Sequence, residues 1–115
     1  MQLGKSVGLF GQHFAFKTTG AASAGRSLVR ALESQDETSR TLAGMFLVKN
    51  GAKSLPYLRE ALAQRRSVPM VLQIMADIGE PSVEPDLVRF TDDPDSEVAR
   101  AARAALETLR FLHHS

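Results

Sequence analysis

The stretch Asp92–Leu109, DDPDSEVARAARAALETL, decides the fold because it encodes one complete amphipathic helix with its own start signal. Its first residues favour a turn, and either Asp95 or Ser96 can accept hydrogen bonds from the backbone N–H groups that open a helix. The apolar stripe that follows at helical spacing is Val98, Ala102, Ala105, Leu106 and Leu109, and the opposite face carries Arg100, Arg103, Glu107 and Arg110. Because alanine lets a second helix approach closely, the stretch predicts a helix on which another helix packs.

Composition and charge indicate one ordinary soluble domain. The chain has 115 residues, of which 43% are hydrophobic and 23% charged, which suits a single domain with one core. A net charge of +1 creates no overall electrostatic potential that would attract nucleic acid or an anionic membrane. No apolar run reaches the roughly 18–20 residues of a membrane span, and the N-terminus is too glycine-rich for a signal peptide. We therefore expect a cytoplasmic protein without a membrane segment.

The pattern changes near residue 24. Residues 1–24 contain recurrent glycines and no acidic residue, and they predict an N-terminal arm or capping helix whose apolar stripe is Leu3, Val7, Phe10 and Phe14. Residues 25–115 form a second region of regular helical periodicity. The helices predicted there are Arg26–Ser34, Thr38–Lys49, Ser54–Gln64, Ser67–Ile78, Pro85–Thr91 and Ser96–Leu112.

An internal repeat organises the second region. Gly51 and Gly79 each end a helix and stand 28 residues apart, and each is followed by a proline, Pro56 or Pro85, at the start of a short helix. A longer helix then completes each unit. Superposing these longer helices aligns Ser39, Ser67 and Val98; Ala43, Val71 and Ala102; Phe46, Ile74 and Ala105; and Leu47, Met75 and Leu106. The pattern predicts an all-α fold of about three antiparallel helix pairs.

Pro85–Leu109 and the helix-ending glycines Gly51 and Gly79 resemble HEAT repeats, in particular the short HEAT-like repeats found in phycobilisome lyases. The resemblance covers about residues 24–112. It implies a short α-solenoid, or α/α superhelix, in which neighbouring pairs share a continuous core and the second helices build an inner surface. A scaffold that binds another protein is the function that the resemblance implies.

The segment Ser67–Ile78, SVPMVLQIMADI, has only three polar residues, and a helix that is apolar all round is covered on all sides. Neighbouring repeats can cover two faces. The inner face predicted to remain holds Pro69, Leu72, Gln73 and Ala76, flanked by Thr41, Gly44 and Val48. Three coverings are open: the N-terminal arm folding back, self-association into a homo-oligomer, or a partner peptide or helix.

The favoured function is a protein–protein interaction module or adaptor. Leu72, Gln73 and Ala76 are its candidate apolar contacts, and Arg100, Arg103 and Glu107 are the candidate polar contacts. One alternative is nucleic-acid binding through an arginine-rich face, which we consider less favoured because thirteen carboxylates balance fourteen basic residues. Another is a non-catalytic subunit of a lyase-type enzyme, which the resemblance alone suggests.

Catalytic, metal and cofactor sites are not predicted. The chain has no cysteine, which removes thiol chemistry, and its histidines His13, His113 and His114 lack the spacing of metal ligands. The acidic turn at Asp92–Asp95 lacks the glycine and glutamate of a calcium loop. No nucleophile–base pair is identifiable, so we do not expect an enzyme.

Overall fold

The computed structural model describes residues 8–14, 16 and 22–113, and every regular element in these ranges is helical. The all-α prediction is therefore confirmed. Residues 8–14 form a first short helix. The elements that follow, with η for a 3-10 helix, are α2 (Ala22–Arg30), η1 (Ala31–Glu33), α3 (Glu37–Asn50), η2 (Gly51–Ser54), α4 (Leu55–Ala63), α5 (Val68–Ile78), η3 (Pro81–Val83), α6 (Glu84–Val88) and α7 (Ser96–Leu112).

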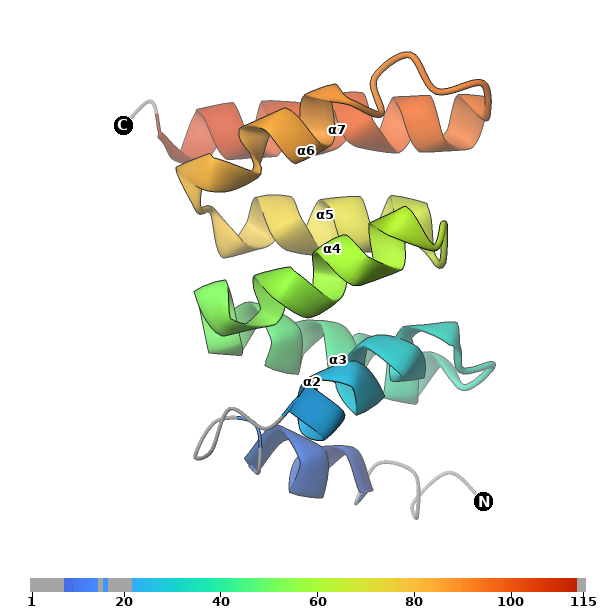
Figure 1. Cartoon of the computed structure of the whole chain (residues 1–115), viewed down its shortest axis with the longest axis vertical. Coiled ribbons are helices and arrows are strands. Elements are labelled where there is room, and N and C mark those ends of the chain that lie inside the picture. The colour runs from blue at the N-terminus through green and yellow to red at the C-terminus, as the bar shows by residue number, and fades with distance from the viewer. Residues whose placement is uncertain (1–7, 15, 17–21, 114–115) are drawn as a thin grey trace.

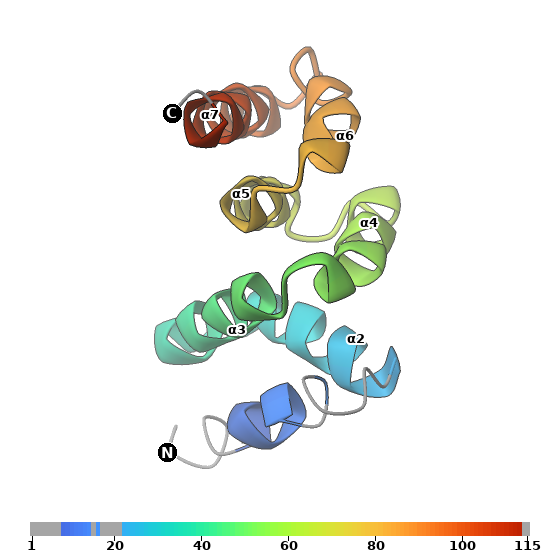
Figure 2. The same cartoon turned by 90° about the vertical axis from the view of Figure 1, so that its left-hand side faces the viewer.

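Consecutive helices run in opposite directions and lie in pairs, α2 with α3, α4 with α5 and α6 with α7 (Figure 1). Viewed from the side, α3, α5 and α7 form one column and α2, α4 and α6 form a second, with the helix of residues 8–14 at the end beside α2 and α3 (Figure 2). Within the first column α7 packs more extensively on α5 than α3 does. The molecule measures 38 × 28 × 24 Å along its principal axes.

The core lies between the two columns and contains the residues that the repeat pattern aligned. Every residue of the four aligned sets is buried except Ser67, which is half-buried. Large side chains of this core include Leu47, Leu58, Leu72 and Met75, all fully covered. The periodicity of the sequence therefore identified the buried stripes of α3 and α7 correctly.

Aspartates start two of the three long helices. Asp36 Oδ2 accepts hydrogen bonds from Ser39 N at 3.1 Å and from Ser39 Oγ at 2.7 Å at the start of α3. Asp95 Oδ1 accepts from Glu97 N at 2.9 Å at the start of α7. Of the two caps that the sequence left open for α7, the structure uses Asp95. Such caps satisfy backbone N–H groups that have no partner inside the helix.

The turn into α5 is built differently. Ser67, which precedes α5, has a φ of 49° and makes no side-chain cap, and Arg65 has a φ of 53°. Both residues occupy the left-handed region, which costs a residue with a Cβ about 1–2 kcal/mol. The tertiary contacts of this turn must offset that cost, and one of them is the ion pair of Arg65 described below.

Two helices differ from their predicted bounds by more than one residue at an end. α2 begins at Ala22, four residues before the predicted start at Arg26. Gly25, which the sequence analysis placed just before this helix, lies inside it. A Cβ at Gly25 would lie 2.7 Å from the ring of Tyr57, so glycine is needed for α2 to approach α4 this closely. α6 ends at Val88 instead of Thr91, and turns follow it.

Two glycines of the first pair should respond in opposite ways to alanine. Gly51 has φ 58° and ψ −131°, which a Cβ disfavours, so Gly51→Ala should lower the free energy of unfolding by more than about 1 kcal/mol. Gly44 is helical, and its added Cβ would make an ordinary 3.6 Å contact with Ile74, so Gly44→Ala should raise stability by about 0.5–1 kcal/mol. Urea titrations measure both changes, and equal shifts in the same direction would contradict these backbone assignments.

Candidate functional site

A groove of about 750 Å³ opens between α3 and α5. All of the residues that line it belong to α3 and α5. The faces of these two helices that point away from α2 and α4 are not covered by another described helix. The residues that line it are Glu37, Arg40, Thr41, Gly44, Met45, Val48 and Lys49 of α3 and Met70, Ile74 and Asp77 of α5. We call this site the α3–α5 groove.

Two methionines form the upper walls of the groove, one on each helix. Met45 is 50% exposed and Met70 is 36% exposed, and they are the only exposed large apolar side chains of α3 and α5. Ile74 forms the floor, with its Cδ1 3.6 Å from where a Cβ of Gly44 would lie. Because glycine puts no side chain at this point, the groove keeps its depth.

Charges of both signs surround this apolar centre. Glu37 and Arg40 lie toward the start of α3, whereas Lys49 lies near its end and Asp77 near the end of α5. Arg40 Nη1 donates a hydrogen bond to the backbone oxygen of Ser34 at 2.7 Å, which directs this guanidinium partly away from the groove. An apolar centre with a polar rim is the usual anatomy of a protein–protein interface.

The predicted apolar contacts on α5 are wrong in their placement. Leu72 and Ala76 are 0% exposed, so neither can touch a partner at the surface. Gln73 is half-buried and donates to Asp77 Oδ1 at 3.0 Å, on the exposed stripe that also carries Met70. Because α3, α4 and α7 all pack on α5, its apolar residues point in every direction and the sequence pattern could not select the open side.

The predicted polar contacts on α7 also lie outside the groove. Arg100, Arg103 and Glu107 are exposed, but none of them lines it. Arg103 pairs with Asp92 at 3.6 Å, which places this stripe of α7 beside the loop that follows α6. The predicted apolar and polar contact residues therefore do not line one shared groove.

The described part of the N-terminal arm covers the end of the α2–α3 pair. The ring of His13 stacks on that of Phe46 with centroids 4.1 Å apart, and Asn50 Nδ2 lies 3.0 Å from His13 Nδ1. Phe16 is buried and meets Tyr57 edge-on at 5.7 Å. No described residue of the arm lines the groove, so the described part of the arm does not supply the covering that was one of the three open alternatives.

Metal ligands and membrane spans were searched for among the described residues. No cluster of three or more potential ligands lies among them, and no described helix is long and apolar enough to cross a bilayer. His113 Nε2 lies 2.6 Å from the backbone oxygen of Gly79, so it joins the end of α7 to the end of α5. Leu3, Val7 and His114 lie outside the described residues.

Arginines that a nucleic-acid surface would use form ion pairs with carboxylates instead. These pairs join each helix pair to the next, so the guanidinium groups are partly neutralised where the layers meet. They are Arg26–Glu60 at 3.1 Å, Arg59–Asp86 at 3.0 Å, Arg65–Asp93 at 2.9 Å and Arg66–Glu33. Exposed pairs of this kind stabilise a protein by about 0–1 kcal/mol each, but they orient the elements that carry them.

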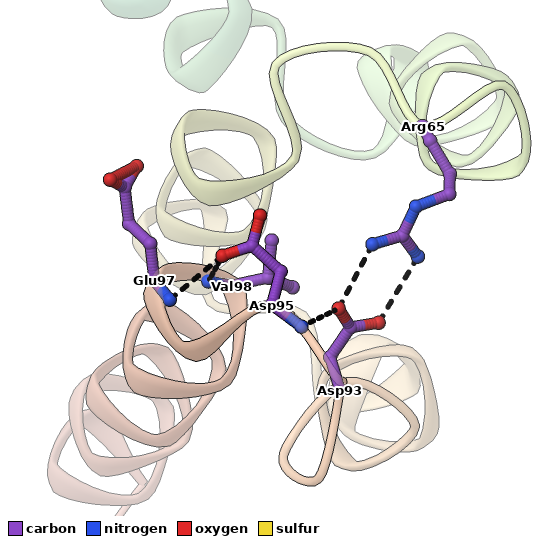
Figure 3. Close-up of polar contacts among 5 residues, drawn as sticks. All are labelled: Arg65, Asp93, Asp95, Glu97 and Val98. Atoms are coloured by element: carbon purple, nitrogen blue, oxygen red, sulfur yellow. Dashed lines mark hydrogen bonds and ion pairs between the residues drawn. The ribbon is translucent and has the colours of Figure 1, made fainter.

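The pair of Arg65 is linked to the start of α7 (Figure 3). Arg65 donates through Nη1 and Nη2 to the two oxygens of Asp93 at 3.1 and 2.9 Å, and Asp93 Oδ2 also accepts from Asp95 N at 3.0 Å. The hydrogen bond from Arg65 lowers the pKa of Asp93, the Asp95 N–H contributes in the same direction, and burial opposes both. The turn before α5 is thereby fixed to the turn before α7.

Sequence reasoning did not select Met45 and Met70, although it named their neighbours Thr41, Gly44 and Val48. Helical spacing from Gly44 and Val48 could have included Met45, but an exposed methionine has no signature of its own. No family model matches the chain, and no curated protein or solved structure matches it significantly. The groove itself must therefore support any functional argument.

Asp93→Asn should remove a pH-dependent part of the stability. Because the folded-state pKa of Asp93 is lowered, its contribution is present above the ordinary value of about 3.9 and is lost as the pH falls through the lower folded value. Urea unfolding should show the variant to be less stable than the wild type at pH 7, with the difference narrowing below about pH 4. Asp92→Asn, at a side chain 97% exposed, is the control, and equal behaviour of the two variants would contradict the role of Arg65.

Proposed function

We propose that this chain is a short HEAT-like α-solenoid of three helix pairs that acts as an adaptor by binding an amphipathic helix of another protein in the α3–α5 groove. The aligned core positions support the repeat, because equivalent residues of α3, α5 and α7 are buried together. The ion pairs add to this support. Arg26–Glu60, Arg59–Asp86 and Arg65–Asp93 join residues 34, 27 and 28 positions apart, close to the repeat length.

The single observation that carries the binding proposal is the exposure of Met45 and Met70 on opposite walls of one groove. Two exposed apolar side chains that line the same groove from different helices can both be buried by one bound partner. Methionine is unbranched and polarisable, so it adapts to the side chains of a partner and is frequent in grooves that receive amphipathic helices. The mixed charges of the rim would then orient the polar face of that helix.

Nucleic-acid binding has weaker support. Four arginines of the proposed basic surface already pair with carboxylates on neighbouring layers, so fewer cations remain for phosphates. A role beside a lyase rests only on the resemblance of Pro85–Leu109 to its repeats, and the α3–α5 groove adds nothing specific to it.

Photo-crosslinking would identify the partner and test the groove together. A photoreactive residue at position 45 should capture one protein far more efficiently than the same residue at Val88, which is a similarly exposed apolar position on α6. Met45→Glu and Met70→Glu should each weaken the affinity of that purified protein about tenfold, because roughly 1.5 kcal/mol of methionine burial is lost.

Val88→Glu is the matched control and should bind with wild-type affinity. Circular dichroism should show the same helicity and melting for all three variants, since each glutamate replaces an exposed side chain. Equal capture at positions 45 and 88, or wild-type affinity in both methionine variants, would disprove the groove as the binding site.

A further inference from the structure

We propose that Met45 and Met70 are a redox-sensitive pair, and that their oxidation by hydroperoxides to sulfoxides closes the α3–α5 groove to its partner. The inference rests on the proposed function, since it concerns control of the same groove. It assigns a covalent modification to two named side chains and a chemical class to the reagent.

Exposure separates the methionines of the described chain into two classes. Met45 is 50% exposed and Met70 is 36% exposed, whereas Met75, on the same helix as Met70, is 0% exposed. Oxidation requires that the peroxide reach the thioether sulfur, so accessibility orders the reaction. Met75 is therefore an internal control within α5 itself.

The composition of the chain directs peroxide to these side chains. Thiolates are the sulfur groups that consume hydroperoxides most readily, and this chain contains no cysteine. The exposed methionine thioethers then become the accessible sulfur of the groove. Both line the α3–α5 groove, Met45 from α3 and Met70 from α5, so a change in their polarity changes the lining from both helices.

The chemical step is an oxygen transfer. The Sδ lone pair of methionine attacks one peroxide oxygen, an S–O bond forms, and the O–O bond breaks. Sulfur loses two electrons, the peroxide is reduced to water or an alcohol, and no proton is left unbalanced, because the leaving oxygen receives the proton of the attacked oxygen. Reduction of the sulfoxide by an enzyme that uses a dithiol restores the thioether.

The product alters the groove without opening the core. A sulfoxide is polar and accepts hydrogen bonds, so the two walls lose their preference for apolar side chains. The floor formed by Ile74 and the buried Met75 stay as they are, because neither sulfur of the modified pair belongs to the fully buried core. Oxidation should thus reduce binding while leaving the fold intact.

Limited oxidation of the full-length chain with hydrogen peroxide, followed by proteolysis and mass spectrometry, tests the selectivity. Sulfoxide should form at Met45 first and at Met70 next, with Met75 at least about tenfold slower than either. Comparable rates at Met75 and Met45 would overturn the inference. The melting temperature should stay unchanged after treatment, because oxidation at exposed sulfurs leaves the fold intact.

Nile red fluorescence then tests the effect on the groove without any partner. Peroxide treatment should lower Nile red affinity of the wild type about tenfold, as the loss of two apolar walls predicts. The Met45→Leu/Met70→Leu variant keeps the groove apolar and retains Met1 and Met75, so its Nile red affinity should not change on treatment. An equal loss in this variant would overturn the inference.

The two proposals fail in different ways. If Met45→Glu lowers Nile red binding but peroxide does not, the groove stands and the redox inference is wrong. If neither treatment changes Nile red binding, the apolar groove is not a binding surface and both proposals are wrong. Restoration of binding by methionine sulfoxide reductase with a dithiol is the expected final result, and its failure would exclude the sulfoxides as the cause.

Discussion

The burial of α5 on three sides is the constraint on which the rest of the structure depends. Helices α3, α4 and α7 all pack on it, and its own residues are apolar in almost every direction. The distance between two packed helices depends on the side chains between them. On the α7 side these include alanines such as Ala102 and Ala105, and the packing is extensive. On the α3 side the packing is less extensive, and there the groove opens, with Ile74 of α5 among the residues that line it.

The polar contacts of the fold support this arrangement from its edges. Ion pairs join successive helix pairs, and the contact of Arg65 with Asp93 ties the strained turn before α5 to the start of α7. Each pair alone adds little stability because it is close to solvent. Together they hold the helix pairs in place. None of the four pairs that join successive helix pairs involves a residue that lines the α3–α5 groove. These arginines therefore contribute to the positions of the helix pairs, and their charge is partly neutralised by the carboxylates.

Much of this structure could be predicted from local sequence signals. Gly51 and Gly79 end helices as expected because both have a positive φ, and Asp95 starts α7 through a side-chain cap. The phase of α5 could not be predicted, since an apolar pattern without a polar side gives no direction. The stacking of His13 on Phe46 joins residues far apart in the chain, and no local pattern encodes it.

The α3–α5 groove is where the sequence departs from the rule that apolar residues of a helix are buried. Along α3, α5 and α7 the apolar residues are mostly buried, as expected for a sequence whose signals agree with its fold. Met45 and Met70 depart from this rule, because a polar residue at either position would be compatible with the helix and would remove an aggregation risk. Leucine would supply similar apolar area with a better-defined shape. A flexible, oxidisable side chain on both walls is what the proposed functions require, because methionine adapts to the shape of a partner and its sulfoxide would weaken that partner's binding.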